Sequence, residues 1–352
     1  MDSCEDNALQ GPTDELSMSV VVPAHQAAPF IERCVKGLLD AGFRTSEILV
    51  VDDGSRDGTG DIAHALDVGV LRNETPLKPA RARNLGVAQT TSDIIVFVDA
   101  DVVVHPGARA RILEAFQSSE DLTALFGSYD DAPKVQNTAA RYRNLLHHHV
   151  HQSSAGRVES FWTGFGAVRR QAFLAVDGFD ATCDMMEDVE LGLRLTEGHI
   201  ELMPDLLCKH LKDWTLFSMF RSDLFDRAIP WTRLIAAGRT RAGQLNLTRN
   251  HQFSAASVAF FGLTFLLAVV NVQFLWLSLA ALIVFLDVNR RFFGLLYRLG
   301  GLRLMVPSIA LHGVHYFAAL LGYVWVMYVE RPFLIERSPS SVASSERETE
   351  TT

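Results

Sequence analysis

Two aspartates at the end of an apolar run have the residue type and spacing to hold a cation. Asp99 and Asp101 follow the run at residues 94–98 and are separated by one alanine. Alternate side chains on an extended strand point to the same face, so both carboxylates can converge on one ion. Mg²⁺ is commonly held by one or two carboxylates together with phosphate oxygens and water. The pattern therefore predicts a metal-bound diphosphate site, and its alternative is a solvated strand end.

The elements that would position this pair alternate along the chain. Short β-branched runs at residues 18–22, 47–51, 68–71 and 94–98 are separated by helical stretches at 30–41, 57–65 and 79–90. This alternation is typical of βαβ units in a mainly parallel sheet, where ligands bind beyond the carboxyl ends of the strands. The segments at those ends are Pro23-Ala24-His25, Asp52-Asp53-Gly54-Ser55 and Asp99-Ala100-Asp101.

Four motifs occur in order along this α/β region. They are Val20-Val21-Val22-Pro23, Val50-Val51-Asp52-Asp53-Gly54-Ser55-Arg56-Asp57-Gly58-Thr59, Ala82-Arg83-Asn84-Leu85-Gly86 and Asp99-Ala100-Asp101. The series resembles family-2 glycosyltransferases of the GT-A fold, over roughly residues 18–235. The resemblance implies a Rossmann-like GT-A catalytic domain in a membrane-anchored, bacterial-type member with C-terminal transmembrane helices. It also implies an inverting enzyme that uses a UDP- or GDP-sugar and Mg²⁺ or Mn²⁺.

The resemblance assigns donor-binding roles. Asp53, with Asp52 beside it, matches acids that accept hydrogen bonds from the nucleotide base or ribose. The same two residues suit a strand-to-helix turn, and both interpretations can hold. Arg83 would pair with a phosphate or the base, or else lie on a solvated helix face. The other donor-binding residues are Pro23, Ala24, Asp99 and Gly164.

Three residues are expected around the metal. Asp101 is the better ligand candidate, whereas Asp99 contacts the sugar or ribose or binds the ion through water. His210 lies where many GT-A enzymes have a late histidine, and its alternative is a surface or packed histidine. A separate cluster lacks the ligand spacing of a zinc site and is expected on a partly exposed helix; it comprises His147, His148, His149 and His151.

A second acidic motif lies downstream, at Glu187 and Asp188. It resembles the family's Glu-Asp motif, so Asp188 is the expected general base toward an acceptor hydroxyl and Glu187 orients it or contacts the acceptor. The alternative is a helix N-terminus, where acids are favoured by the macrodipole. Residues 161–170 resemble the glycine-containing strand that lines the donor sugar and the acceptor. There Trp162 either stacks on a sugar or packs as an ordinary aromatic.

The composition changes near residue 250. Residues 253–271 and 272–286 are apolar and uncharged, and a third apolar segment covers 304–329. Since a span needs about 20 residues, the first two predict two short spans or one re-entrant hairpin. Buried core helices are the alternative. The flanking arginines predict a multi-pass inner-membrane protein with a cytoplasmic catalytic domain; they are Arg239, Arg241, Arg249, Arg290, Arg291, Arg298 and Arg303.

These observations divide the chain into five expected regions. They are a disordered lead-in without a secretory signal (1–17), the GT-A domain (18–212), interfacial amphipathic helices and a linker (213–250), a membrane region with two to three transmembrane helices (251–330) and a disordered tail (331–352).

The whole-chain properties narrow the function. A net charge of −9 argues against a nucleic-acid partner. Residues 227–231 depart from the Gln-X-X-Arg-Trp motif of processive synthases, which favours transfer of a single sugar to a lipid, polyprenyl-linked or membrane-proximal acceptor. The alternatives are a sugar-nucleotide nucleotidyltransferase and a non-catalytic membrane protein that binds sugar nucleotides.

Overall fold

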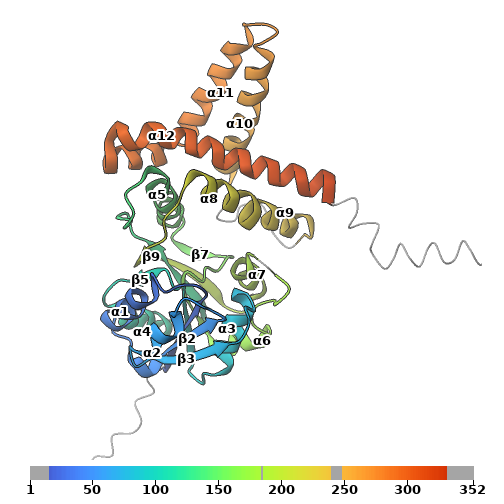
Figure 1. Cartoon of the computed structure of the whole chain (residues 1–352). Coiled ribbons are helices and arrows are strands. Elements are labelled where there is room, and N and C mark those ends of the chain that lie inside the picture. The colour runs from blue at the N-terminus through green and yellow to red at the C-terminus, as the bar shows by residue number, and fades with distance from the viewer. Residues whose placement is uncertain (1–15, 184, 239–247, 331–352) are drawn as a thin grey trace, which may run out of the picture.

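The computed structural model describes residues 16–183, 185–238 and 248–330. Figure 1 shows a sheet domain, a layer of helices across one end of it, and a helical hairpin that projects away from this layer. The expected disordered tail, most of the expected lead-in, Arg239 and Arg241 lie outside the described residues.

Within the described residues the strands form one mixed sheet in the order β3-β2-β1-β4-β8-β6-β9-β5, with β7 beside β9. The strands are β1 (Met18–Ala24), β2 (Ile48–Asp53), β3 (Gly69–Asn73), β4 (Ile94–Val98), β5 (Val102–Val104), β6 (Leu122–Tyr129), β7 (Gly156–Val158), β8 (Phe165–Arg169) and β9 (His199–His210). The first four pair in parallel, at nearly the predicted positions, so the predicted α/β class is confirmed. Strand β8 is antiparallel to β4 and β6 because the chain re-enters the sheet at the carboxyl end of β4.

Helices cover both faces of the sheet, which explains why its central strands are almost wholly buried. Val20 and Val22 of β1 pack into one core, whereas Val21 points into the other. The first core is covered by α1 (Ile31–Asp40), α2 (Thr59–His64) and α4 (Ala108–Ser118), and the second by α3 (Pro79–Ala88), α6 (Arg170–Ala175) and α7 (Glu187–Arg194). A short 3-10 turn, η1 (Thr45–Glu47), precedes β2.

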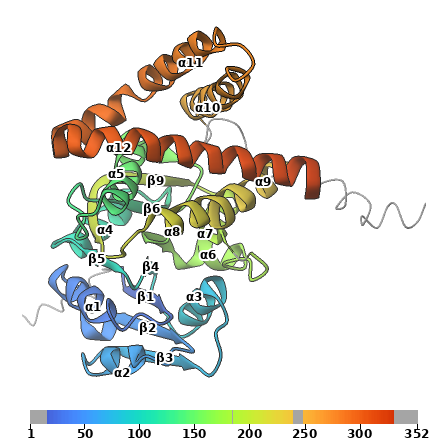
Figure 2. The same cartoon turned by 45° about the horizontal axis from the view of Figure 1, so that its top comes forward.

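A third core joins the sheet domain to the C-terminal helices. Tyr142 and Leu145 pack there against Trp214, Phe292 and Leu296. The layer consists of α5 (Thr138–Gln152), α8 (Leu216–Arg221), the π-helix η2 (Ser222–Ala228), α9 (Ile229–Ala236) and α12 (Arg290–Val324), which continues into η3 (Trp325–Glu330). Figure 2 shows α12 lying across this layer.

The first two apolar segments form the projecting hairpin, α10 (Arg249–Leu267) and α11 (Phe274–Val288). Its turn is exposed, with Val269 89% and Val270 86% accessible to solvent. The third segment lies within α12 and η3, and α12 kinks at Gly301 (φ 61°, ψ −160°). Among the described helices, Arg290–Glu330 is the one long and apolar enough to cross a membrane, and α11 is apolar but shorter. Helix length therefore does not support the expected multi-pass arrangement.

Candidate active site

A cleft of about 1390 Å³ lies beyond the carboxyl ends of β1, β2 and β4. Pro23, Ala24 and Asp53 line it at the donor end predicted from the sequence. The cleft then passes the second acidic motif and continues between the C-terminal helices, where Ile235 and Leu320 line it. The sheet end and the helical layer thus share one continuous cavity.

The two aspartates after β2 have different surroundings. The carboxylate of Asp53 accepts hydrogen bonds from the side chain of Asn73 (2.7 Å) and from the backbone N–H groups of Leu77 and Lys78 (2.9–3.0 Å). It therefore holds the loop that leads into α3, while also lining the cleft. Asp52 lies outside the cleft lining and accepts a hydrogen bond from the N–H of Ser55 at 3.1 Å. Asp52 thus occupies the strand-to-helix turn given above as an alternative.

Arg83 joins the two acidic motifs. Its Nη2 lies 2.8 Å from Asp99 Oδ1 and its Nη1 lies 2.5 Å from Glu187 Oε1. The side chain is buried and its guanidinium lies 5.6 Å from the ring centre of Phe179. The pairing of Arg83 with a phosphate or the base stays a prediction. In the structure Arg83 lines the cleft and neutralises one carboxylate from each motif.

Asp101 and His210 come together on neighbouring parts of the sheet. His210 Nε2 lies 3.5 Å from Asp101 Oδ2, and the N–H of Leu211 donates to the carbonyl of Asp101. Burial raises the pKa of Asp101, but His210 and Lys212 offset this and hold that pKa below the ordinary value. Asp99 differs, because burial raises its pKa despite the nearby Arg83.

The donor set suits a hard divalent ion that also binds phosphate. Among the described residues, no group of three or more His, Cys, Asp or Glu side chains is arranged to hold a metal. Mg²⁺ that completes its shell with phosphate and water is nevertheless commonly bound through one or two carboxylates. Asp101 would supply such a carboxylate with the His210 ring beside it, whereas Asp99 is directed to Arg83.

Asp188 stands at the start of α7, facing the cleft without an ion-pair partner among the described residues. One carboxylate oxygen accepts from the N–H of Val189 (2.8 Å) and the other from the N–H of Thr163 (3.4 Å). Burial and the negative charge of Glu187 raise the pKa of Asp188 to about 7. A carboxylate with this pKa can accept a proton at neutral pH. Glu187 and Asp188 also lie in the first turn of α7, so they occupy the helix N-terminus that was the alternative interpretation of this motif.

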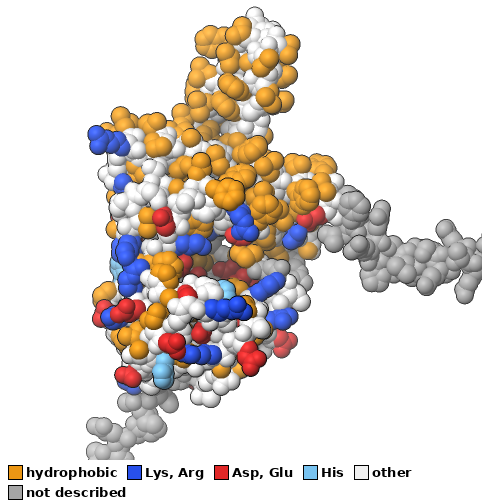
Figure 3. All heavy atoms as spheres, viewed as in Figure 1, with side chains coloured by type: hydrophobic (Ala, Val, Ile, Leu, Met, Phe, Trp, Pro, Cys, Tyr) orange, Lys and Arg blue, Asp and Glu red, His pale blue; other side chains and the backbone are white. Residues whose placement is uncertain are grey.

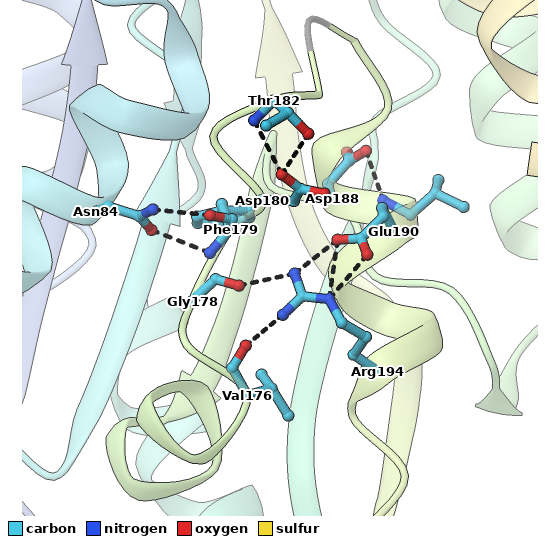
Figure 4. Close-up of polar contacts among 10 residues, drawn as sticks. Asn84, Val176, Gly178, Phe179, Asp180, Thr182, Asp188, Glu190 and Arg194 are labelled. Atoms are coloured by element: carbon cyan, nitrogen blue, oxygen red, sulfur yellow. Dashed lines mark hydrogen bonds and ion pairs between the residues drawn. The ribbon is translucent and has the colours of Figure 1, made fainter. Parts of the chain in front are cut away.

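The segment before α7 is anchored on two sides (Figure 4). Asn84 of α3 donates to the carbonyl of Phe179 (2.8 Å) and accepts from its N–H (3.0 Å). Arg194 of α7 donates to the carbonyl of Gly178 at 2.7 Å and pairs with Glu190 at 2.6 Å. Met186, directly before α7, has a φ of 66°, which is rare for a residue with a side chain. These contacts hold the start of α7 at the cleft.

Trp162 lines the cleft, and its indole packs directly against Gly164. A Cβ built on Gly164 would lie 2.2 Å from the indole, so only glycine leaves room for the ring. Tyr129 and His151 contact the other sides of Trp162, with ring centres 4.9 and 5.0 Å away. The carbonyl of Gly164 also accepts from the N–H of Asp99 at 3.3 Å. Gly164 therefore positions other residues of the site from beneath, outside the cleft lining.

The structure adds cleft residues that sequence analysis did not assign. Arg143 and Asp223 form a buried ion pair at 2.5 Å, and Arg227 Nη1 lies 2.7 Å from His147 Nε2. All four line the cleft. Two features of the sequence pointed to these segments: the departure of residues 227–231 from the synthase motif, and the histidine cluster at residues 147–151. Neither feature shows that α5 and η2 meet in the folded protein.

Comparisons with known proteins agree with this architecture. Residues 19–176 match the model of glycosyl transferase family 2. The pre-mycofactocin glycosyltransferase of Mycobacterium tuberculosis is 30% identical over 224 residues, covering 56% of this chain and 44% of that protein. Glycosyltransferase GlyG of Streptococcus pneumoniae is 31% identical over 117 residues, covering 32% of this chain and 38% of that protein. The chain thus spans less than half the length of these relatives.

A solved structure shares the fold across most of the chain. The mannosyltransferase PcManGT from Pyrobaculum calidifontis, in complex with GDP-Man and Mn²⁺, gives a TM-score of 0.56 at 19% identity and covers 90% of this chain and 89% of its own. This likeness confirms the expected GT-A fold. The match over residues 19–176 identifies this part of the chain as a domain of glycosyltransferase family 2.

Proposed function

We propose that the protein is an inverting glycosyltransferase that moves one sugar from a UDP- or GDP-sugar to a lipid or membrane-proximal acceptor. The observation that carries this proposal is the convergence of the two acidic motifs on one cleft, where Arg83 pairs with Asp99 and Glu187. A donor site and a base for the acceptor are the two parts that such a transfer needs. The relatives that match the chain are themselves named glycosyltransferases.

The donor would bind at the end of the cleft lined by Pro23, Ala24 and Asp53. Asp101 and His210 would hold Mg²⁺ or Mn²⁺, which when bound neutralises charge on the diphosphate. Lys212 also lines the cleft there and adds positive charge. Asp99 is held in place by Arg83 and faces the same cavity.

Asp188 would act on the acceptor. In its ionised form the carboxylate accepts the proton of a hydroxyl while the oxygen of that hydroxyl bonds to the anomeric carbon and the bond to the nucleoside diphosphate breaks. A single displacement of this kind inverts the anomeric carbon. The N–H groups of Val189 and Thr163 orient the carboxylate. Glu187 is committed to Arg83 and is therefore a positioning residue.

The helical end of the molecule supports an acceptor at a membrane. Hydrophobic side chains gather over the hairpin and the upper helices, while charged side chains gather on the sheet domain (Figure 3). A hairpin with Val269, Val270 and Trp276 exposed suits insertion into a lipid layer. By the positive-inside rule, the basic residues near its ends support a sheet domain on the cytoplasmic side.

One assay tests the proposal. Purified full-length protein in detergent is given UDP- and GDP-sugars, Mn²⁺ or Mg²⁺ and a lipid extract. We expect release of nucleoside diphosphate that requires lipid, stops with EDTA, returns with added metal and is lost in Asp101→Asn. Exchange of diphosphate with a nucleoside triphosphate would instead identify a nucleotidyltransferase. The absence of turnover with every donor would leave a binding protein and overturn the proposal.

A further inference from the structure

The part of the cleft between Asp188 and the apolar helices contains two arginines, one of them buried with unpartnered donor nitrogens. Arg143 of α5 is 2% exposed, and Asp223 is its partner through Nη1. Its Nε and Nη2 are buried and have no hydrogen-bond partner among the described residues. A buried guanidinium with unsatisfied donors is costly, because neither water nor protein replaces the lost hydration.

A second guanidinium lies close by. Arg227 of η2 donates to His147, and no carboxylate of the described chain lies within ion-pair distance of it. Burial and the nearby Arg143 lower the pKa of Arg227 to about 10, while burial keeps His147 neutral by lowering its pKa. Asp223 is shared between Arg143 and His315, whose Nδ1 lies 3.1 Å away. Asp223 is thus shared, and although Asp226 also lines the cleft, two donor nitrogens of Arg143 remain without a partner among the described residues.

The position of these arginines indicates the ligand. They line the same cleft as Asp188, and the cavity continues past them between α9, α10 and α12, where Ile235, Ala255 and Leu320 line it. An anion seated there would have the transfer site on one side and an apolar passage on the other. Guanidinium groups offer paired N–H donors that match the oxygens of a phosphate.

We propose that Arg143 and Arg227 bind the phosphate group of a lipid acceptor, whose reacting hydroxyl faces Asp188 and whose hydrocarbon chain leaves through the apolar end of the cleft. This inference rests on the proposed transferase function and names the acceptor class. The unpartnered nitrogens of Arg143 satisfy their hydrogen bonds on the phosphate, and Arg227 adds a second guanidinium beside it.

The test measures binding to the full-length protein in detergent micelles by calorimetry. The probes are farnesyl phosphate, farnesol as its neutral match, inorganic phosphate, and the nucleoside diphosphate of the donor. We expect farnesyl phosphate to bind at least about tenfold more tightly than farnesol or inorganic phosphate, since each lost charge-assisted hydrogen bond costs roughly one to two factors of ten. Arg227→Gln should remove most of this preference, and Arg227→Lys should retain part of it.

Controls separate binding from folding. Arg143→Gln alone would leave Asp223 buried without its partner, so the double variant Arg143→Gln/Asp223→Asn removes both charges together. Arg221→Gln changes an exposed arginine outside the cleft lining and should bind farnesyl phosphate normally. The thermal midpoint of each variant shows that it remains folded.

Three results would overturn the inference. One is equal affinity for farnesyl phosphate and farnesol. Another is inorganic phosphate binding as tightly as the lipid, which would identify a site for the free ion. The third is an equal loss of nucleoside diphosphate and farnesyl phosphate binding in Arg227→Gln, which would assign the arginines to the donor. If one of these three results is found while the protein still releases nucleoside diphosphate from the donor, the proposed transferase function is unaffected. That function is tested separately, by lipid-dependent turnover and its loss in Asp101→Asn.

Discussion

At the scale of single residues, the site contains two adjacent carboxylates, of which Glu187 is ion-paired and Asp188 is not ion-paired within the described residues. Glu187 is paired with the buried Arg83, whereas within the described residues its neighbour Asp188 accepts only backbone hydrogen bonds. The two adjacent carboxylates thus differ in their surroundings, and such a difference separates their pKa values. Burial beside Glu187 gives Asp188 the pKa of about 7 that a base at neutral pH needs.

Asp188→Asn should lower kcat by about 10²- to 10⁴-fold, the usual contribution of a general base. For the wild type, activity should rise with pH and level off above a midpoint near 7, because only the ionised carboxylate accepts a proton. A pH–rate profile of sugar transfer measures both. Asp180→Asn, which keeps an oxygen to accept from Thr182, is the matched control and should retain activity. Near-normal transfer by Asp188→Asn would exclude this base and favour an acceptor whose nucleophile is already ionised.

The same substitution should not harm folding at high pH. The pKa of Asp188 is about 7 in the folded protein and about 4 in an unfolded chain, so the folded state binds more protons between these values. Stability contributed by this group is therefore lost as pH rises from about 4 to 7. Above pH 7 the asparagine variant should be at least as stable as the wild type, as measured by thermal unfolding. A clear loss of stability there would show that Asp188 has a favourable partner when ionised.

Arg83→Gln should destabilise the fold by about 3 kcal/mol, because it leaves two carboxylates near each other without their cation. Asp99 is partly exposed to solvent, so we expect the loss of stability to lie near the lower end of the range for breaking a buried ion pair. Denaturant unfolding measures this change. The double variant Arg83→Gln/Glu187→Gln should recover much of the stability but not the activity, since Asp99 remains unpaired. If the double variant were no more stable than the single one, the Arg83–Glu187 pair would not be the source of the effect.

At the scale of elements, the site depends on close contacts between strands and helices. The carbonyl of Gly164, at the start of β8, binds the N–H of Asp99 at the end of β4, and its missing side chain makes room for Trp162. Asn84 of α3 holds the segment before α7 through the backbone of Phe179. Gly164 and Asn84 both belong to the sequence motifs but do not line the cleft. Each affects the site through the residue that it contacts.

Gly164→Ala should displace the indole of Trp162, because the new Cβ would lie 2.2 Å from it. Overpacking of this kind typically costs about 1–3 kcal/mol, and we expect a rise in KM together with lower thermal stability. Gly294→Ala is the control, since a Cβ there meets nothing within 4 Å. Steady-state kinetics and thermal unfolding decide the outcome. Unchanged values for Gly164→Ala would show that the ring has room to move.

At the scale of the whole molecule, a charged sheet domain carries an apolar hairpin on a helical layer. The layer is attached through α5, where Tyr142 Oη lies 2.9 Å from His312 Nδ1 and Arg141 donates to the carbonyl of Leu299 at 2.9 Å. Because α5 follows β6 and α8 follows β9, the sheet domain and the helical layer are joined at more than one point of the chain.

Val269→Asp/Val270→Asp should reduce membrane binding by at least about tenfold, because a charged group in the apolar region of a bilayer costs several kcal/mol. Co-sedimentation with vesicles of phosphatidylglycerol and phosphatidylcholine measures the change. Nucleoside diphosphate binding should be unaffected, since the hairpin turn lies outside the cleft lining. Leu174→Asp, an exposed site on α6, should bind vesicles like the wild type. Equal binding by both variants would place the membrane contact elsewhere.

The sequence predicted the parts of this protein that depend on local patterns. The first four strands and the segments after them follow from β-branched runs and turn residues, so Asp53, Asp99 and Asp101 were placed correctly at the cleft. The pairing of Arg83 with Glu187 was not predictable, since 104 residues separate them and only the folded sheet brings them together. The same holds for Arg143 and Asp223, which belong to α5 and η2. Hydropathy found the apolar segments but not that α12 lies across the layer.

The position of α12 across the helical layer fixes the distance between the projecting hairpin and the sheet domain. If the hairpin inserts, the helical layer that includes α9 and α12 sets how far the sheet domain, and with it Asp188, stands from the lipid surface. The reacting atom of the acceptor must then lie within a narrow range of depths. Acceptors with a short link between lipid and nucleophile would be selected, and longer head groups would carry their nucleophile past the base.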